Sequence, residues 1–219
     1  MDLKTYQTLT QQGVKILQRE TVYIQDTVKI GRNTTIEPFC VLLGKTEIEE
    51  NCIIGSFSYL KDAKVKSGAQ VDAVRITDSS VGEHSIVGPF ARLRQDAEVK
   101  DFCKVGNFVE IKNSTLGSGS KASHLTYVGD ATIGKNCNVG CGTIFVNYDG
   151  KNKHHTLVGD DVFLGCNSNL IAPLKVADGT FVACGTTVTK NTNQDDFIIG
   201  RSRETVKPKL AKKYLGGQK

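Results

Sequence analysis

Aliphatic residues recur at every sixth position along most of the chain, and glycine follows many of them, as in Ile30-Gly31 and Val139-Gly140. A period of six fits neither the 3.6-residue turn of an α-helix nor the two-residue alternation of a strand. It predicts a solenoid of short strands and tight turns, with one aliphatic side chain of each hexad directed inward and glycine relieving the backbone at the turn. The predicted inward residues are Ile24, Ile30, Ile36, Leu42, Ile48, Ile54, Leu60, Val81, Val87, Leu93, Val99, Val105, Ile111, Leu116, Ala122, Val128, Ile133, Val139, Leu164, Leu170, Val176, Val182 and Val188.

Two segments depart from this pattern. Residues 1–20 carry helix formers between Asp2, a possible cap, and Gly13. We expect a short helix there that covers the open end of the solenoid, where unpaired strand edges would otherwise be exposed. Residues 147–157 are polar and contain Asp-Gly, and they predict a loop extruded between two runs of the repeat. The expected organisation is a helical cap over 1–20, a β-helix over 21–200 and a basic tail over 201–219.

Composition places few further limits on function. No apolar run is long enough to cross a bilayer, and the N-terminus lacks the basic-then-apolar pattern of a signal peptide, so we expect a soluble, cytoplasmic protein. Seven cysteines, none in a Cys-x-x-Cys pair, favour free thiols over a disulfide framework.

The net charge of +5 and the pI of about 8.8 are too weakly basic to predict nucleic-acid binding. Basic residues do concentrate near the C-terminus, where they form a solvated tail or supply one or two contacts to a phosphorylated ligand. They are Arg201, Arg203, Lys207, Lys209, Lys212, Lys213 and Lys219.

Several longer strings are more specific than the repeat. In chain order they are GPFARLR (88–94), VGNFVEIK (105–112), GSKASHLTYVGD (119–130), NVGCGTIFVNYDGKNKHHT (138–156) and IAPLKVADGTFVACGTTVT (171–189). Together with the repeat, they resemble the hexapeptide-repeat acetyltransferase domain of bifunctional bacterial enzymes that combine N-acetylglucosamine-1-phosphate uridyltransferase and glucosamine-1-phosphate N-acetyltransferase activities. The resemblance runs ungapped from about Gly88 to Arg201, and residues 20–65 also resemble the first coils of that domain.

The resemblance implies an all-β fold, a left-handed parallel β-helix with three hexads per coil, and a homotrimer with active sites between subunits. It also implies transfer of an acetyl group from acetyl-CoA to the amine of glucosamine 1-phosphate, without a metal, for UDP-N-acetylglucosamine and cell-envelope synthesis. No glycine-rich nucleotide loop precedes the repeat. We therefore expect either a stand-alone acetyltransferase or an excised domain, without the uridyltransferase activity or its magnesium site.

His124 is the residue that the resemblance identifies as the general base. The substrate amine arrives largely protonated, and a base with a pKa near 7 suits its activation. Glu110 matches a carboxylate that orients the imidazole, and the amine attacks acetyl-CoA directly in a ternary complex. His124 lies two places after the inward Ala122, so the repeat predicts a position near an edge of the prism and outside its core.

The resemblance also assigns the ligand-binding residues. Arg94 and Lys112 match contacts to phosphate and sugar, Tyr127 and Asn138 match hydrogen bonds to the sugar, and Lys153 matches a lysine from the neighbouring subunit. The acetyl-CoA positions are Cys141, Asn147, Tyr148, Cys166, Cys184 and Arg201. Cysteine stands at three of these positions where alanine or serine is usual. The substitution matters little where the backbone makes the contact, but it weakens any hydroxyl hydrogen bond at Cys166.

Four alternatives remain open at this point. The cysteines at the predicted acetyl-CoA positions allow an acyl-cysteine mechanism in which His124 activates a cysteine. The acceptor could be another amino-sugar phosphate, such as galactosamine 1-phosphate, and the trimer could be a non-catalytic scaffold. A zinc enzyme is the fourth, but the histidines show no convincing ligand spacing. They are His84, His124, His154 and His155.

Overall fold

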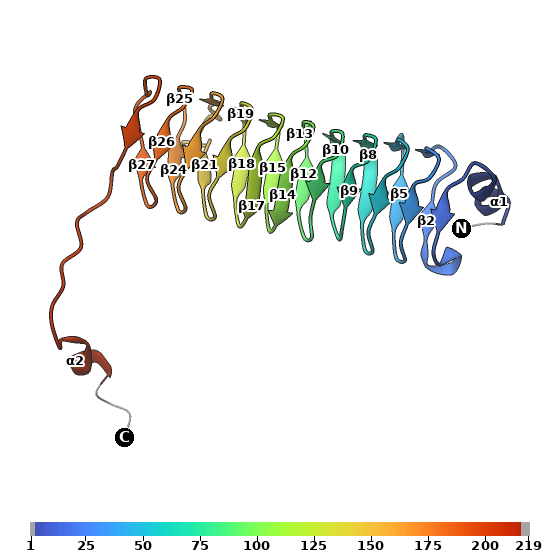
Figure 1. Cartoon of the computed structure of the whole chain (residues 1–219), viewed down its shortest axis with the longest axis horizontal. Coiled ribbons are helices and arrows are strands. Elements are labelled where there is room, and N and C mark those ends of the chain that lie inside the picture. The colour runs from blue at the N-terminus through green and yellow to red at the C-terminus, as the bar shows by residue number, and fades with distance from the viewer. Residues whose placement is uncertain (1–2, 216–219) are drawn as a thin grey trace.

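A computed structural model describes residues 3–215 as a long solenoid with a helix at one end and an extended tail at the other (Figure 1). Helix α1 spans Leu3–Gln11, the 3₁₀ turn η1 spans Arg19–Thr21, and helix α2 spans Ala211–Leu215 in the tail. The predicted cap Asp2 lies outside the described residues. Within residues 3–215, no helix is both long and apolar enough to span a membrane.

The strands of the solenoid form three faces of a prism, and all the pairings between coils are parallel. The first face contains β1 (Lys15–Ile16), β4 (Thr35–Ile36), β7 (Ile53–Ile54), β9 (Gln70–Val71), β11 (Ile86–Val87), β14 (Lys104–Asn107), β17 (Lys121–His124), β20 (Asn138–Val139), β23 (Phe163–Leu164), β26 (Phe181–Val182) and β28 (Phe197–Ile198). The second contains β2 (Tyr23–Ile24), β5 (Val41–Leu43), β8 (Tyr59–Val65), β10 (Arg75–Val81), β12 (Arg92–Arg94), β15 (Glu110–Lys112), β18 (Tyr127–Gly129), β21 (Ile144–Val146), β24 (Asn169–Ile171) and β27 (Thr187–Val188). The third contains β3 (Lys29–Ile30), β6 (Glu47–Ile48), β13 (Glu98–Val99), β16 (Thr115–Leu116), β19 (Ala131–Ile133), β22 (Thr156–Val158) and β25 (Leu174–Val176), with β8 and β10 shared between the second and third faces.

The core of the prism is the stack of aliphatic side chains that the six-residue period predicted. Every predicted inward residue is buried, and Ile36, Leu93 and Ile111 are completely inaccessible. Each such side chain contributes roughly 1.5–3 kcal/mol by leaving water. The structure therefore confirms the all-β solenoid fold. The left hand of its winding stays a prediction from the family resemblance.

The repeat slips in the sequence because the coils differ in length. Lys29 and Glu47 stack in adjacent coils at a separation of 18 in residue number. Asn107 and His124 stack with a separation of 17. The longest separation is 25 residues, between Lys135 and Asp160, because the loop between β21 and β22 is inserted there.

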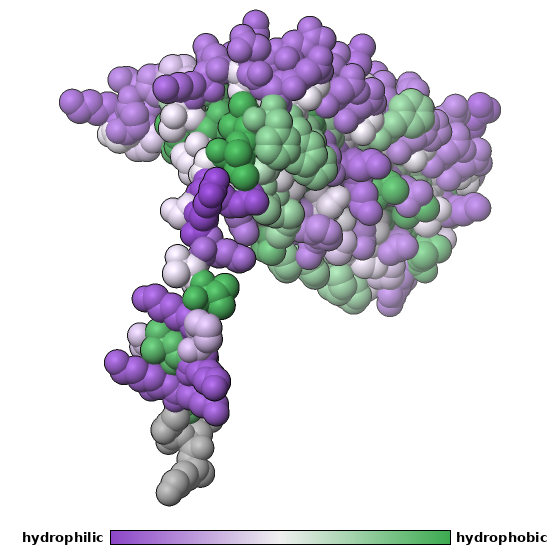
Figure 2. Space-filling model, turned by 60° about the vertical axis from the view of Figure 1, so that its left-hand side comes forward, coloured by the Kyte–Doolittle hydropathy of each residue, from purple (hydrophilic) through white to green (hydrophobic). Residues whose placement is uncertain are grey.

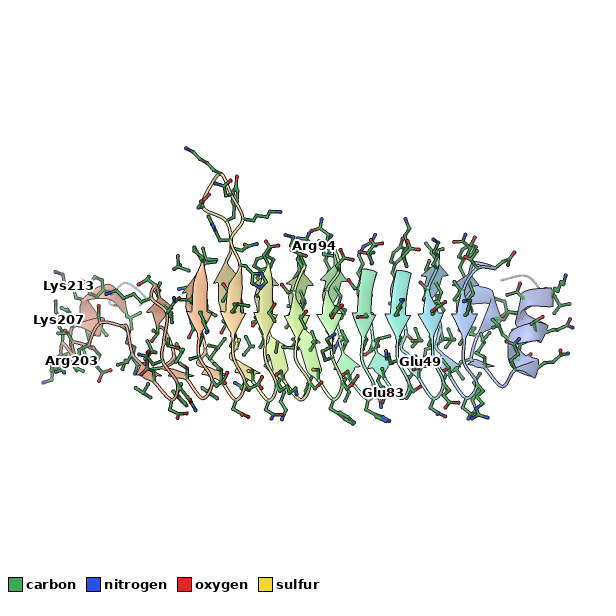
Figure 3. All side chains as sticks on the ribbon, turned by 90° about the horizontal axis from the view of Figure 1, so that it is seen from above. Glu49, Glu83, Arg94, Arg203, Lys207 and Lys213 are labelled. Carbon is green, nitrogen blue, oxygen red and sulfur yellow. The ribbon has the colours of Figure 1, made fainter. Side chains whose placement is uncertain are left out.

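That loop, residues 147–155, leaves the solenoid and rises above its surface (Figure 3). Asp149 organises it by accepting hydrogen bonds of 2.7 Å from the backbone N–H groups of Lys151 and Asn152 and from Nε2 of His154. These contacts, with the bond from Asn152 the largest, lower the pKa of Asp149 to about 2. The ionised carboxylate therefore fixes the turn of the loop.

Exposed apolar side chains gather at the C-terminal end of the solenoid, where the tail begins (Figure 2). Phe181 of β26 stacks on Phe163 and Phe197 of the two neighbouring coils, with ring centroids 4.6 and 5.3 Å apart. The repeat thus aligns side chains outside the prism as well as inside it.

Candidate active site

His124 ends strand β17 and is exposed just before a corner of the prism, where Leu125 has a φ of +47°. Its Nδ1 lies 2.7 Å from Oδ1 of Asn107, which occupies the same position one coil earlier. An amide oxygen only accepts hydrogen bonds, so this contact assigns the ring hydrogen to Nδ1. Nε2 then carries a lone pair that can accept a proton, and it has no hydrogen-bond partner among residues 3–215. Asn107 is a partner that the sequence analysis missed.

Glu110 has a different partner from the one that the resemblance implies. Its Oε1 accepts a 2.6 Å hydrogen bond from Nε of Arg94, and Nη1 of Arg92 lies 4.0 Å from Oε2. Within the described part of the chain, no hydrogen bond joins Glu110 to His124. Its orienting role therefore stays a prediction, and in this single chain Asn107 holds the imidazole.

Lys112 and Asp130 form a buried ion pair at the corner between the second and third faces. Nζ of Lys112 lies 2.8 and 3.0 Å from the two carboxylate oxygens, and both residues are at least nine-tenths buried. Asn113 and Asn147 donate further hydrogen bonds to the same carboxylate. A buried charge is expensive unless it is paired and hydrogen-bonded, and here both conditions are met. Asp130 is a second residue that the sequence analysis did not single out.

The pKa values of this pair favour the ionised forms. Burial alone would raise the pKa of Asp130, but the hydrogen bonds from Asn113, Lys112 and Asn147 outweigh it and hold the pKa below 3.8. Burial alone would lower the pKa of Lys112, but its bond to Asp130 outweighs that effect and raises the pKa above 10.5. At neutral pH this corner therefore holds an ionised pair, in which the Asp130 carboxylate anchors the Lys112 ammonium.

Lys153, on the extruded loop, lies beside Lys112 of its own chain. The contact with Lys112 and its charge lower the pKa of Lys153 below 10.5, and Arg94 adds to the repulsion. Arg94 and the loop lie on the same side of the solenoid (Figure 3). We call Arg94, Lys112 and Lys153 the cation cluster. It adjoins a hollow of about 500 Å³ lined by Gln95, Asp96, Lys112, Asn113, Asp130, Lys153, His154 and His155.

A row of polar side chains follows the corner between the first and second faces. Its members occupy the same position in successive coils, because the strands before them pair in register. We call it the edge row; it consists of Asn107, His124, Cys141, Cys166 and Cys184. At its end, Nη1 of Arg201 donates a 2.7 Å hydrogen bond to the backbone oxygen of Cys184. Four of the residues that the resemblance connects with acetyl-CoA or catalysis thus share one edge with His124.

The second face lies between the edge row and the cation cluster. Tyr127 of β18 pairs in register with Glu110 on this face. A Cβ atom on Gly129 would lie 2.4 Å from the Tyr127 hydroxyl oxygen, so glycine is needed for the tyrosine ring to lie where it does. A ligand that lies across the second face meets a histidine at one edge and three cations at the other.

Three predicted residues lie apart from their expected group. Asn138 is on the first face, where it pairs in register with Lys121 and Phe163. Asn147 is buried against Asp130 at the cation corner and is not on the edge row. Tyr148 is exposed on the loop, and its hydroxyl donates a 2.7 Å hydrogen bond to the Gly150 oxygen.

No group of three or more histidine, cysteine, aspartate or glutamate side chains within residues 3–215 is arranged to hold a metal ion. The two histidines of the loop are each held by a hydrogen bond. His154 contacts Asp149 and His155 contacts the Thr132 hydroxyl, at 2.7 and 3.0 Å.

Comparison with known proteins supports the fold and the resemblance. Residues 27–62 match a family model described as bacterial transferase hexapeptide (six repeats). The chain is 48% identical over 213 residues to the bifunctional protein GlmU of an Exiguobacterium species, which covers 97% of this chain and 47% of that protein. It is 44% identical to the GlmU of Clostridium novyi, over 93% of this chain and 45% of the relative. The chain thus spans about half the length of the curated relatives it matches.

Solved structures overlap less closely. The acetyltransferase domain of PglB from Neisseria gonorrhoeae, solved in complex with acetyl coenzyme A, matches with a TM-score of 0.40 and 14% identity, over 60% of this chain and 62% of that one. The similarity of this chain to known proteins therefore rests on the sequence relatives. The chain is thus similar to the bacterial hexapeptide transferases over residues 27–62 and, over nearly all its residues, to the bifunctional GlmU proteins. This similarity confirms the resemblance that its motifs carry.

Proposed function

We propose that this chain transfers an acetyl group from acetyl-CoA to the amine of glucosamine 1-phosphate. The observation that carries the proposal is the placement of His124. Its ring is exposed, Asn107 holds Nδ1, and Nε2 is free at the edge of a face whose opposite edge bears the cation cluster. The similarity to bifunctional GlmU proteins supports an amino-sugar acceptor and acyl-group chemistry.

The cation cluster suits the phosphate of the acceptor. Lys112 is fixed by Asp130 and stays charged, so it offers an anchored positive charge. Arg94 donates from Nε to Glu110 and from Nη1 to Oε1 of Gln95, and we propose that its Nη2 donates to a phosphate oxygen. An arriving phosphate dianion relieves the repulsion between Lys112 and Lys153. We therefore propose that phosphate binding, more than sugar binding, selects the acceptor.

The edge row suits the reaction itself. The acceptor amine, once it has lost its ammonium proton, attacks the thioester carbonyl carbon of acetyl-CoA while Nε2 of His124 takes a proton from the attacking nitrogen. The tetrahedral intermediate then collapses, the carbon–sulfur bond breaks, and the imidazolium returns the proton to the CoA thiolate. We propose that the pantetheine arm lies along Cys141, Cys166 and Cys184, with Arg201 at the end of the groove.

The location of Asn138 supports an assembly with sites between chains. It lies on the first face, apart from the cation cluster of its own chain. A homotrimer in which neighbouring prisms face each other would bring Asn138 of one chain towards the second face of another. In the proposed setting the enzyme works in the cytoplasm on small-molecule substrates.

An acetyl-transfer assay tests this function. Wild-type protein with acetyl-CoA and glucosamine 1-phosphate is compared with His124→Ala, for which we expect turnover to fall about 10²–10⁴-fold. His84→Ala is the matched control. His84 is also exposed, but it lies nearer the N-terminus than His124 and its ring stacks on that of Phe102. Glucosamine and galactosamine 1-phosphate are tested as alternative acceptors. Absence of transfer by wild type contradicts the function, and full activity of His124→Ala contradicts the role of the histidine.

A second mechanism gains support from one observation: Cys141 occupies the edge row directly after His124. In that mechanism the Cys141 thiol accepts the acetyl group first and the amine attacks the acyl-cysteine. Cys141→Ala separates the two. Largely retained turnover supports direct attack, whereas lost turnover together with an acetylated wild-type chain in the mass spectrum supports the acyl-cysteine.

A further inference from the structure

The cysteines fall into two classes by environment. Four are buried, and each sulfur donates to a backbone oxygen of the next coil, as Cys137 does to Gly159 at 3.0 Å. Burial is the main cause that raises the pKa of all four thiols, that of Cys40 to about 11. Buried thiols of raised pKa are poor nucleophiles. They are Cys40, Cys52, Cys103 and Cys137.

The other three cysteines lie outside the core on the edge row. Cys166 and Cys184 are exposed and Cys141 is half-buried. The Gly185 N–H donates a 2.8 Å hydrogen bond to the Cys166 oxygen, which places Cys166 and Cys184 in adjacent coils at the same corner. Paired strands lie about 4.7–4.9 Å apart, and disulfides join Cα atoms separated by about 4.4–6.8 Å. The general spacing of paired strands is therefore within the Cα range of a disulfide between these two cysteines.

We propose that Cys166 and Cys184 form an oxidisable dithiol whose disulfide obstructs the acetyl-CoA groove. The effect on the groove rests on the proposed function, but formation of the disulfide does not. With hydrogen peroxide as the oxidant, one thiol loses its proton and the thiolate attacks an O–O oxygen. The O–O bond breaks, a sulfenic acid forms, and the departing hydroxide takes up the proton as water. The second thiol then attacks the sulfenic sulfur, the S–S bond forms, and a second water leaves. Reduction by an external dithiol restores both thiols.

The position of Arg201 explains why oxidation would affect ligand binding. Its Nη1 donates to the Cys184 oxygen at 2.7 Å and lies 3.5 Å from the Cys184 sulfur. A disulfide turns that sulfur towards Cys166 and removes it from the guanidinium. The bridge also ties together two coils along the line on which the pantetheine arm is proposed to lie. We expect the oxidised protein to have a raised KM for acetyl-CoA that dithiothreitol restores.

The experiment is oxidation of the full chain with hydrogen peroxide or diamide, followed by alkylation and tryptic mapping without reduction. Cleavage after Lys153, Lys175 and Lys190 places Cys166 on peptide 154–175 and Cys184 on peptide 176–190. The expected product is these two peptides joined by a disulfide within one chain. Disulfides only between chains, only sulfinic acid, or free thiols at both positions would each overturn the proposal.

Two variants sharpen the result. Cys166→Ser removes one partner, so the linked peptide must disappear, whereas Cys141→Ser leaves both partners and must retain it. The KM for acetyl-CoA is then measured before oxidation, after oxidation and after reduction. An unchanged KM in the disulfide form contradicts the effect on the groove. If the reduced protein transfers no acetyl group at all, the proposed function fails while the linked peptide still supports the dithiol, so the two failures are distinguishable.

Discussion

Charged side chains stack in adjacent coils near the N-terminal end of the solenoid and again in its middle, but in different environments. Near the N-terminus, Lys29 lies 2.7 Å from Glu47 with both side chains well exposed to water. At the candidate site, Lys112 lies 2.8 Å from Asp130 with side chains only 7% and 8% exposed. The distance is nearly the same in the two pairs, because both are charge-assisted hydrogen bonds of ordinary length. The difference is the cover that Asn113 and Asn147 provide over the second pair.

This difference in burial indicates which of the two ion pairs holds its charges in a fixed position. An exposed pair contributes little, because water and salt screen it and two long side chains must be ordered. A buried pair is expensive to form and is tolerated only when its hydrogen bonds are complete. Most of the buried side chains of the solenoid belong to the aliphatic stack, so the buried pair is not its main stabilising element. We therefore interpret it as a device for holding the Lys112 ammonium in one place.

The largest expected effect comes from removing one partner of the buried ion pair. Asp130→Ala leaves the Lys112 charge buried without its counter-ion, which costs about 3–5 kcal/mol in unfolding free energy. Urea unfolding followed by circular dichroism measures the change. Glu47→Ala is the matched control at the exposed pair, and we expect its unfolding curve to stay near that of wild type. Equal losses in the two variants would contradict the contrast.

The free energy of unfolding should depend on the ionisation of this pair at both acid and alkaline pH. The pKa of Asp130 lies below 3.8 in the folded protein, so its contribution is complete above pH 3.8 and is lost as the pH falls through the folded value. The pKa of Lys112 lies above 10.5, so its contribution is complete below pH 10.5 and is lost as the pH rises through the folded value. Unfolding free energies measured across the pH range should therefore fall at both extremes.

Asp130→Asn provides the control for this pH profile. The amide cannot ionise, so the part of the acid-side loss that comes from this carboxyl must vanish. If the unfolding free energy of the variant falls at acid pH as much as that of wild type, other carboxylates cause the loss of stability. The expected change is smaller than that of Asp130→Ala, because an amide of the same shape keeps some of the hydrogen bonds.

The sequence predicted the interior of the prism well, since burial of Ile111 or Val128 depends only on the period of the aliphatic residues. It also predicted that His124 lies at an edge, by counting from Ala122. It did not predict the partners across coils. Asn107 stacks under His124 at a separation of 17 residues, whereas Lys112 and Asp130 bond at a separation of 18.

The repeat alone does not predict the length of each coil. A change of one residue in the length of a coil changes which outward-facing side chains lie next to each other in adjacent coils. The position of Asn147 depends in addition on how the loop folds back, which has no period at all. These partners become visible only when the coils are stacked. The motifs thus nominate residues for the site, but they did not predict the geometry that joins two coils.

The stacked phenylalanines of the first face allow a milder test of alignment outside the core. Phe181→Ala removes both the contact with Phe163 and that with Phe197, and each aromatic pair contributes about 0.5–1.5 kcal/mol beyond its buried area. The loss should appear in urea unfolding. Phe57→Ala is the control with one stacking partner, Phe39, so its loss should be smaller. A larger loss for Phe57→Ala would contradict the additive stacking of neighbouring coils.

The smallest expected effect leaves stability unchanged and alters only the reactivity of one amine. Lys29 and Lys153 are both exposed, but their neighbours have opposite charges. Glu47 raises the pKa of Lys29 through a hydrogen bond and its charge, whereas Lys112 lowers that of Lys153. Acylating reagents attack the neutral amine, and its fraction at a given pH grows tenfold for each unit by which the pKa falls. Competitive labelling at pH 8 with peptide mapping should therefore modify Lys153 faster than Lys29.

The variant Lys112→Met removes the neighbouring charge and should slow the labelling of Lys153. Inorganic phosphate should also slow it if the phosphate binds between the Lys112 and Lys153 amines. Labelling of Lys153 that is unaffected by Lys112→Met would show that the two amines are not neighbours in solution, and the cation cluster would lose one of its members.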